Sequence, residues 1–257
     1  MDNTIFIALL LSALAGGATA IGGLLAFFIK KKNLSALSLG LGFSAGVMIY
    51  VSFMEILPQA TQTLQTLYGE KTGAWSGTGI FFGGIVLAWL IDTLLPSHHV
   101  EQHTLDKSAK LKHLGLFTAL ALAVHNFPEG LATFMATVKD ATLGVSITIA
   151  VAIHNIPEGV AVALPIYHAT GSRQKAFWYS ALSGMAEPVG ALVGFFVLRS
   201  LLHDAAFGVL FSLVAGIMVY IALDELLPTA HEYGNGHRVI WGVVGGMMLM
   251  ALSLLLF

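Results

Sequence analysis

Two short stretches of this chain place metal-binding side chains inside apolar runs. The segment HNFPEG spans residues 125–130, and HNIPEG repeats it at residues 154–159. On a helix, the histidine and the glutamate of each copy lie four residues apart on one face, with the asparagine beside them. Imidazole and carboxylate together suit divalent first-row metals such as zinc, iron, cobalt or manganese. We therefore expect a site for two adjacent ions bridged by carboxylates, with the candidate ligands His125, Asn126, Glu129, His154, Asn155 and Glu158.

A purely structural role is the alternative for both motifs. The proline of each copy removes one backbone hydrogen bond and clashes with the carbonyl four residues earlier, which should loosen the carbonyls of Val124 and Ile153. The glycine that ends each copy would let another helix approach closely. A lone histidine in such a helix would more often hydrogen-bond to a neighbouring helix. Repetition of the whole His-Asn-Glu set favours metal binding over a hydrogen-bond network.

Two further residues could add ligands. Glu187 precedes a proline in the apolar segment SGMAEPVG, and we expect its carboxylate to bind metal. Met48 could offer a thioether, but methionine in an apolar helix is usually a packing residue. From the residues alone, packing is the favoured role for Met48.

Other acids lie within or at the ends of the apolar runs. A charge at the centre of a bilayer costs at least about 2.5–3.5 kcal/mol, and no lysine or arginine lies deep in the runs to pair with these carboxylates. A cation that visits them is one way to stabilise them; helix capping and hydrogen bonds between spans are the other. The candidates for such a pathway are Glu55, Asp92, Asp224 and Glu225, with His98 and His99 in a polar connection that either catches metal or is merely solvated.

Composition places the chain in lipid. Of its 257 residues, 56% are hydrophobic and 10% are charged, whereas soluble domains carry about 25% charged residues. The net charge of -2 gives no indication of nucleic acid binding. The chain has no cysteine, which excludes a disulfide framework and a thiolate metal site. Its first apolar run lacks the basic start of a cleaved signal peptide and is expected to remain as a helix.

The apolar runs are long enough to cross a membrane, which takes roughly 20 mostly apolar residues for each helix. We predict an all-α polytopic membrane protein with eight transmembrane helices. An even number of spans puts both termini on one side. The predicted spans are at about 4–29, 34–57, 76–96, 113–137, 141–169, 174–199, 205–230 and 238–257.

Basic residues are unequally distributed among the connections between these spans. Numbered in chain order, the odd connections hold eight lysines and arginines, and the even connections hold four, which are Lys71, Lys139, Arg199 and Arg238. Lysine and arginine favour cytoplasmic connections. The odd connections are therefore predicted to face the cytoplasm and both termini to face outside.

The chain also contains a longer duplication. Residues 44–60, SAGVMIYVSFMEILPQA, match residues 214–230, VAGIMVYIALDELLPTA, with eight identities in 17 positions. These segments belong to the second and seventh spans, which run in opposite directions, as do the fourth and fifth spans with the HNxPEG motifs. Inverted repeats with interrupted helices near the midplane are typical of secondary transporters. The alternative is a packing duplication without transport.

The paired HNxPEG motifs, the segment SGMAEPVG and eight spans with a histidine-bearing third connection together resemble the ZIP (ZRT/IRT-like) family of divalent metal transporters, most closely its bacterial branch. The resemblance covers essentially the whole chain. It implies one transmembrane domain over residues 1–257 with a 3+2+3 inverted repeat, a cytoplasmic connection at about 97–112, and a binuclear site between the fourth and fifth spans. It also implies a bacterial inner-membrane location, homodimers, and a ligand role for Met48. Some relatives have aspartate where this chain has Asn155, so this site carries one negative charge less.

The function predicted from these features is uptake of divalent metal, zinc above all, with iron, cobalt, manganese and cadmium as further cargo. The ions are cargo, so no permanently bound cofactor is expected, and the partners are metal ions and the lipid bilayer. Glu55 would lie at the outer mouth, and Asp92, Asp224 and Glu225 toward the cytoplasmic exit.

An intramembrane metal-dependent hydrolase is the alternative function, because two adjacent ions could activate water. The chain has no HExxH motif, and an inverted repeat has no evident role in hydrolysis. We therefore expect a transporter rather than an enzyme. The residues leave open whether it works as a channel or as a carrier.

Overall fold

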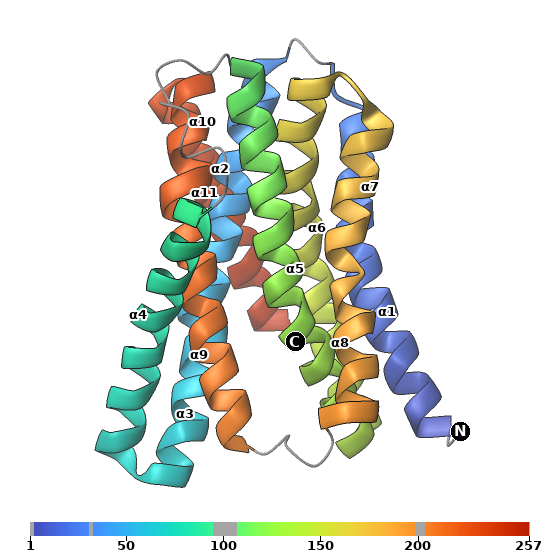
Figure 1. Ribbon diagram of the computed structural model, residues 1–257, viewed down its shortest axis with the longest axis vertical. Coiled ribbons are helices and arrows are strands. Elements are labelled where there is room, and N and C mark those ends of the chain that lie inside the picture. The colour runs from blue at the N-terminus through green and yellow to red at the C-terminus, as the bar shows by residue number, and fades with distance from the viewer. Residues whose placement is uncertain (1–2, 31–32, 95–106, 199–203, 257) are drawn as a thin grey trace.

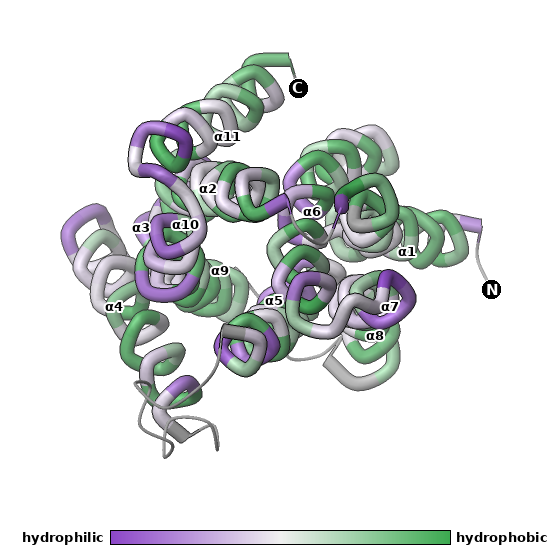
Figure 2. Tube along the Cα trace, turned by 90° about the horizontal axis from the view of Figure 1, so that it is seen from above, coloured by the Kyte–Doolittle hydropathy of each residue, from purple (hydrophilic) through white to green (hydrophobic). Residues whose placement is uncertain are grey.

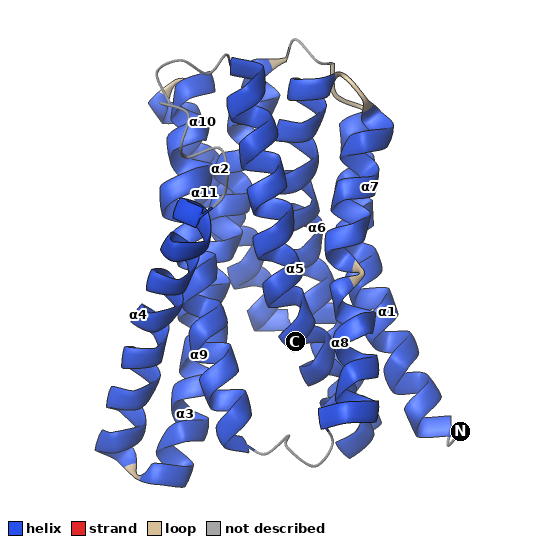
Figure 3. Cartoon of the chain, in the orientation of Figure 1, coloured by secondary structure: helices blue, strands red, loops and turns tan. Residues whose placement is uncertain are grey.

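The computed structural model describes residues 3–30, 33–94, 107–198 and 204–256, and within these ranges the chain is helical and contains no strand (Figures 1 and 3). Six helical runs of the described residues are long and apolar enough to cross a membrane. The all-α polytopic architecture predicted from the sequence is confirmed. In chain order, the eight spans are α1 (Asn3–Leu24) with η1 (Leu25–Phe27); α2 (Leu34–Val51), η2 (Ser52–Ile56) and α3 (Leu57–Tyr68); α4 (Glu70–Leu94); α5 (Lys107–Lys139); α6 (Ala141–Thr170); α7 (Arg173–Gly184), α8 (Ala186–Val193) and η4 (Gly194–Leu198); α9 (Asp204–Tyr220), η5 (Ile221–Leu226) and α10 (Leu227–Tyr233); and α11 (Gly236–Leu256).

Two spans are not among the six apolar runs. One is α5, which starts with the lysines of a polar connection and contains HNFPEG. The other is the sixth span, in which α7 ends at Gly184 and α8 begins at Ala186, directly before Glu187. Both spans therefore depart from a uniform apolar helix where predicted ligands lie.

Spans two and seven each contain a stretch of π-helix just before a leucine–proline step. In η2 the N–H of Leu57 donates to the carbonyl of Ser52, five residues back, and η5 repeats this bond 170 residues later. A proline ring clashes with the carbonyl four residues before it, and the wider π turn gives the ring of Pro58 room while the helix continues. The duplication of 44–60 at 214–230 is therefore also a repeat of backbone geometry.

The second span is longer than predicted. The predicted range ended at 57, but α3 continues the helix through Pro58 to Tyr68, and α4 starts at Glu70 rather than near 76. The π turn of η2 makes room for Pro58, so the helix does not end at this proline. Gly69 turns the chain between the two helices with a φ of +88°, which glycine adopts without steric cost.

Close backbone contacts at glycines define two tightly packed groups of helices, which lie side by side in Figure 2. In the motif group (α1, η1, α5, α6, α7, α8 and η4), a Cβ on Gly130 would lie 2.0 Å from the carbonyl oxygen of Glu187. In the flanking group (α2, η2, α3, α4, α9, η5, α10 and α11), a Cβ on Gly216 would lie 2.0 Å from the carbonyl oxygen of Phe81. Only glycine allows backbones to approach so closely, so each group packs as a unit.

Contacts between the two groups are made largely by side chains. A Cβ on Gly40 of α2 would meet the side chains of Leu164 and Val160 on α6 rather than their backbone. The hydroxyl of Ser44 donates to the carbonyl of Pro157 across the same boundary, at 2.6 Å. Between α5 and α9 the boundary contains an apolar groove of about 430 Å³. The contact between the groups is therefore looser than the packing within them.

The placement of Arg238 with the even connections is a miscount, because this residue follows the seventh connection, and the structure agrees with the odd side. We counted this residue with the even connections, but its guanidinium donates to the hydroxyl of Ser35, at the start of α2, which directly follows the first connection. Arg238 therefore belongs to the odd side, because the seventh connection precedes α11. The count of basic residues becomes nine to three, which strengthens the predicted orientation.

The glycine packing predicts opposite outcomes for two adjacent residues of α4. A Cβ on Gly84 would lie 2.1 Å from the carbonyl oxygen of Leu213, whereas a Cβ on Gly83 has nothing within 4 Å. Replacing Gly84 with alanine should therefore lower the free energy of unfolding by about 1–3 kcal/mol through overpacking. Gly83→Ala should change it little. Thermal unfolding of both variants in detergent checks this, and equal losses would contradict the close approach of α4 and α9.

The charge distribution predicts which connections face the cytoplasm. The chain has no cysteine, and Lys71, Lys112 and His237 are exposed in the structure. Single cysteines at Lys112 and His237 should react with a membrane-impermeant maleimide only after intact cells are opened, and a cysteine at Lys71 should react before. Labelling of Lys112→Cys in intact cells would reverse the orientation, and different behaviour of the Lys112 and His237 variants would contradict the correction of Arg238.

Candidate metal centre

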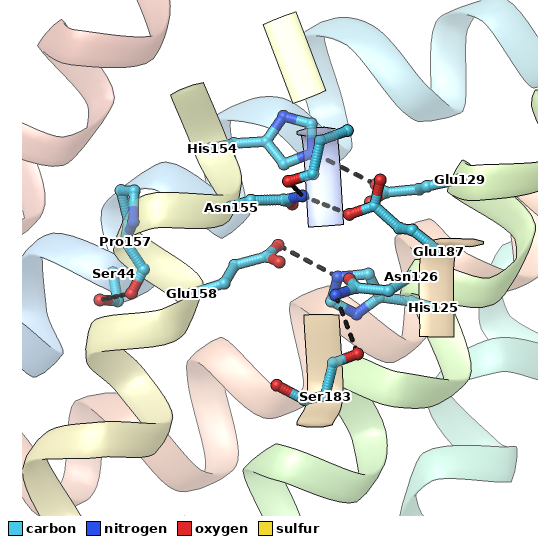
Figure 4. Close-up of polar contacts among 11 residues, drawn as sticks. Ser44, His125, Asn126, Glu129, His154, Asn155, Pro157, Glu158, Ser183 and Glu187 are labelled. Atoms are coloured by element: carbon cyan, nitrogen blue, oxygen red, sulfur yellow. Dashed lines mark hydrogen bonds and ion pairs between the residues drawn. The ribbon is translucent and has the colours of Figure 1, made fainter. Parts of the chain in front are cut away.

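The two HNxPEG motifs face each other on α5 and α6 and pair crosswise (Figure 4). The Nε2 atom of His125 lies 3.1 Å from Oε1 of Glu158, and the Nε2 atom of His154 lies 3.3 Å from Oε1 of Glu129. Each histidine thus meets the glutamate of the other copy. Both helices continue through the prolines of the motifs, so neither α5 nor α6 ends there.

These side chains are removed from solvent almost completely. His125 and Glu158 are 0% exposed, and His154 and Glu129 are each 3% exposed. A buried charge is very costly unless it is paired or binds a metal. The crossed pairs supply such partners for one oxygen of each glutamate, and the other oxygen of each has no hydrogen-bond partner in the described part of the chain.

The two asparagines are oriented by backbone carbonyls of the outer helices. The amide nitrogen of Asn126 donates to the carbonyl of Ser183 on α7 at 3.4 Å, and that of Asn155 donates to the carbonyl of Ala15 on α1 at 2.9 Å. Because a carbonyl only accepts, each amide must direct its nitrogen toward these helices. The amide oxygens, Oδ1, are then free of those contacts, and both are buried without a hydrogen-bond partner among the described residues.

Glu187 joins the site from the sixth span. The break at Met185 ends α7, and Glu187 lies in the first turn of α8, fully buried. Its Oε1 accepts a short hydrogen bond from the amide of Asn155 (Figure 4). The absence of a side chain on Gly130 lets α8 approach α5 at this point. The structure therefore brings together Glu187 and both motifs, and their role as metal ligands stays a prediction.

Close to half of the buried side-chain polar atoms without hydrogen-bond partners among the described residues lie at this site. In native proteins such atoms are rare, and each one calls for an explanation such as an ion. Within the described residues, the site contributes His125 Nδ1, Asn126 Oδ1, Glu129 Oε2, His154 Nδ1, Asn155 Oδ1, Glu158 Oε2 and Glu187 Oε2. All seven are nitrogen or oxygen atoms of the kinds that bind first-row divalent metals.

The remaining candidates near the centre differ in their positions. Glu55 was expected at the outer mouth, but it lies in η2, midway along the extended second span, near the charges of His154 and Glu129. Met48 lies on α2, one turn after Ser44, and is fully buried in a hydrophobic core that several helices share. His98 and His99 lie outside the described residues.

The other acids form a separate cluster. Asp92, Asp224 and Glu225 each offer a ligand atom, and these atoms lie within 4.8 Å of one another. The sequence analysis placed these three acids together toward the cytoplasmic exit, and in the structure α4 and η5 bring their side chains into one cluster. The structure adds Tyr220, whose hydroxyl donates to Oδ2 of Asp92 at 3.3 Å, and His113, whose Nε2 lies 3.8 Å from Oδ1 of Asp92.

Sequence reasoning missed several residues that support the centre. The hydroxyl of Ser44 donates to the carbonyl of Pro157 within HNIPEG, and the hydroxyl of Ser12 donates to the carbonyl of Gly130 at the end of HNFPEG. Tyr220 could have been found, because it lies four residues before Asp224 on one helix face. The contributions of Ala15 and Ser183 come from the backbone, which residue types do not reveal.

An eight-span helical membrane protein with an inverted repeat and a buried polar site between its central helices has the architecture of a secondary transporter. A family model described as ZIP Zinc transporter matches residues 5–113 and 97–254 of the chain. The chain belongs to the ZIP zinc transporter family. It is an integral membrane transporter and not an enzyme.

Relatives of known name match over the full length. The protein named zinc transporter ZupT of Streptococcus mutans is 53% identical, with 100% of each chain covered. The ZupT of Chlorobium phaeovibrioides is 54% identical over 99% of each chain, and that of Campylobacter jejuni is 51% identical over 97% of this chain and 96% of the relative.

The asparagine contacts predict unequal effects of two equivalent substitutions. Asn155→Asp would set a carboxylate against the carboxylate of Glu187 and the carbonyl of Ala15. We expect the metal-free protein to lose about 1–3 kcal/mol of unfolding free energy, because a buried donor is replaced by an acceptor. Asn126→Asp should cost less, since its amide makes one longer bond. Chemical unfolding in detergent measures both, and equal losses would contradict the role of Glu187.

Proposed function

We propose that this protein carries zinc across the bacterial inner membrane into the cytoplasm through a binuclear site between α5 and α6. The observation that carries the proposal is the set of seven buried, unpartnered nitrogen and oxygen atoms around two crossed histidine–glutamate pairs. The names of the relatives from Streptococcus mutans and Chlorobium phaeovibrioides support zinc as the cargo.

The charges of the site suit divalent ions. Glu129, Glu158 and Glu187 bring three negative charges, and each zinc ion would bring two positive charges. One ion would leave one net negative charge and two would leave one net positive charge, so either number keeps the site close to neutral, and the two sets of ligands in the paired motifs are what favour two ions. The histidines would leave their glutamate partners and bind as neutral imidazoles, since metal ligands must be deprotonated. The proposed ligands are His125, Asn126, Glu129, His154, Asn155, Glu158 and Glu187, with Met48 as a further candidate.

The positions of the other acids suit a pathway on either side of this site. Glu55 interacts with His154 and Glu129 and would pass ions in from the outer side. The three acids Asp92, Asp224 and Glu225 offer oxygen ligands, and the Nε2 atom of His113 lies 3.8 Å from Oδ1 of Asp92. Zinc binds carboxylate oxygen and histidine nitrogen, so this cluster could receive the ion on its way to the exit. His98 and His99 remain candidates for the exit.

The packing supports a carrier rather than a channel. Backbone-to-backbone contacts at glycines make the motif group and the flanking group each a unit, whereas side chains dominate the contact between them. Movement of one unit against the other would open the central site to each side in turn, as in other transporters with inverted repeats.

Several features of the proposal follow from the family resemblance. They are a single transmembrane domain over residues 1–257, homodimers, termini outside the cytoplasm, and iron, cobalt, manganese and cadmium as additional cargo. Competition among these metals during uptake would rank them.

Substitution of the two motif glutamates tests the shared site. Glu129→Ala and Glu158→Ala should each lower uptake of radiolabelled zinc into proteoliposomes by at least about tenfold, because even the loss of an outer-shell partner costs 10–100-fold in metal affinity. If both carboxylates bridge the same ions, the double variant should be little worse than the worse single variant, as expected for residues that act together.

The matched control is Glu70→Ala, which removes an exposed acid outside the site. It should transport zinc at the parental rate. Uptake is normalised to folded protein in each case. Near-parental uptake by both single variants would contradict the metal site and favour a structural role for the motifs. Interhelical hydrogen bonds in membranes average only about 0.6 kcal/mol, so the loss of such a bond alone leaves transport measurable.

A further inference from the structure

The inverted repeat pairs Ser44 with Val214 and Pro157 with Pro128. The first pair follows from the match of 44–60 with 214–230, and the second from the match of the two HNxPEG motifs. By this symmetry, the contact of α2 with α6 corresponds to the contact of α9 with α5. Both contacts join the motif group to the flanking group, so they can be compared residue by residue.

One of these contacts is closed by a hydrogen bond. The hydroxyl of Ser44 on α2 donates to the carbonyl of Pro157 on α6 at 2.6 Å, and Ser44 is fully buried (Figure 4). The carbonyl belongs to the residue directly before Glu158. Ser44 therefore fastens the flanking group to the backbone of the metal-binding motif itself.

The equivalent contact is open. Val214 of α9 and Pro128 of α5 both line the apolar groove of about 430 Å³ between these helices. Valine has no hydroxyl to donate, so closing this contact could not form the bond that Ser44 makes. The two halves of the repeat therefore differ in sequence at the place where they differ in conformation.

We propose that Ser44 is a positioning residue that favours the conformation in which α2 rests on α6 over the symmetry-related one in which α9 rests on α5. The hydrogen bond to Pro157 exists only in the first, and Val214 supplies no counterpart in the second. The proposal rests on the proposed carrier function in assuming that both conformations are visited. It makes the two access states of the empty protein unequal in population.

A pair of cysteines across the groove can report the second conformation. The chain has no native cysteine, and Ala123 of α5 and Leu210 of α9 line opposite sides of the groove. In the metal-free double variant Ala123→Cys/Leu210→Cys, the rate of cross-linking by a short bifunctional reagent should rise with the population in which α9 closes on α5.

Ser44→Ala should raise this rate roughly threefold, the factor that corresponds to an average interhelical hydrogen bond in a membrane protein. The exchange variant Ser44→Val/Val214→Ser should raise it more, by about eightfold, because it removes one bond and offers its counterpart to Pro128. An unchanged or lower rate in both variants overturns the proposal.

Ser38→Ala is the matched control. Ser38 lies on the same helix and donates to the carbonyl of Ala230 at 2.8 Å, but this bond joins α2 to α10 within the flanking group. Its loss should leave the cross-linking rate at the parental value. An equal rise in Ser38→Ala would indicate general loosening and overturn the role of Ser44. Because no metal is present, the result is independent of the zinc uptake test, so either proposal can fail alone.

Discussion

The packing of the motif group depends on burying three carboxylates that, among the described residues, pair with no lysine or arginine. Glu129 and Glu158 are stabilised by the histidines of the opposite motif, and Glu187 by the amide of Asn155. A buried charge is costly unless it has a partner. The positions of α5, α6 and α8 along one another are therefore restricted to those in which these side chains meet. Glycines at the ends of the motifs make this approach possible.

Equivalent spans of the inverted repeat accommodate their prolines in the same way. A helix that must bend at a proline either bears the clash within an α-helix, as in α5 and α6, or widens to a π turn first, as in η2 and η5. The acids of spans two and seven lie in these widened turns. In spans two and seven the deviation from regular helix thus occurs where the acidic side chains lie, whereas the π turn of η4 in the sixth span contains only glycine and apolar residues.

Much of the fold could be predicted from the sequence, because lipid imposes a simple rule on span length and the two motifs differ at only one of six positions. The pairing of HNFPEG with HNIPEG and the contribution of Glu187 followed from residue type and spacing. The extension of span two to Tyr68 did not, since hydropathy cannot distinguish a polar helix from a loop. Arg238 was assigned to the wrong side. The roles of the backbone carbonyls of Ala15 and Ser183 could not be predicted, because every residue has a carbonyl and residue type does not show which one accepts a bond.

The backbone role of α1 has a consequence for genetics. This helix orients Asn155 through the carbonyl of Ala15 and approaches HNIPEG so closely that a Cβ on Gly159 would lie 2.0 Å from the carbonyl oxygen of Thr19. A saturation screen for transport would therefore find that, apart from Ser12 with its hydrogen bond to Gly130, the inner face of α1 tolerates changes of chemistry but not of bulk. The residue types of α1 suggest only a packing helix, although its backbone orients the side-chain amide of Asn155.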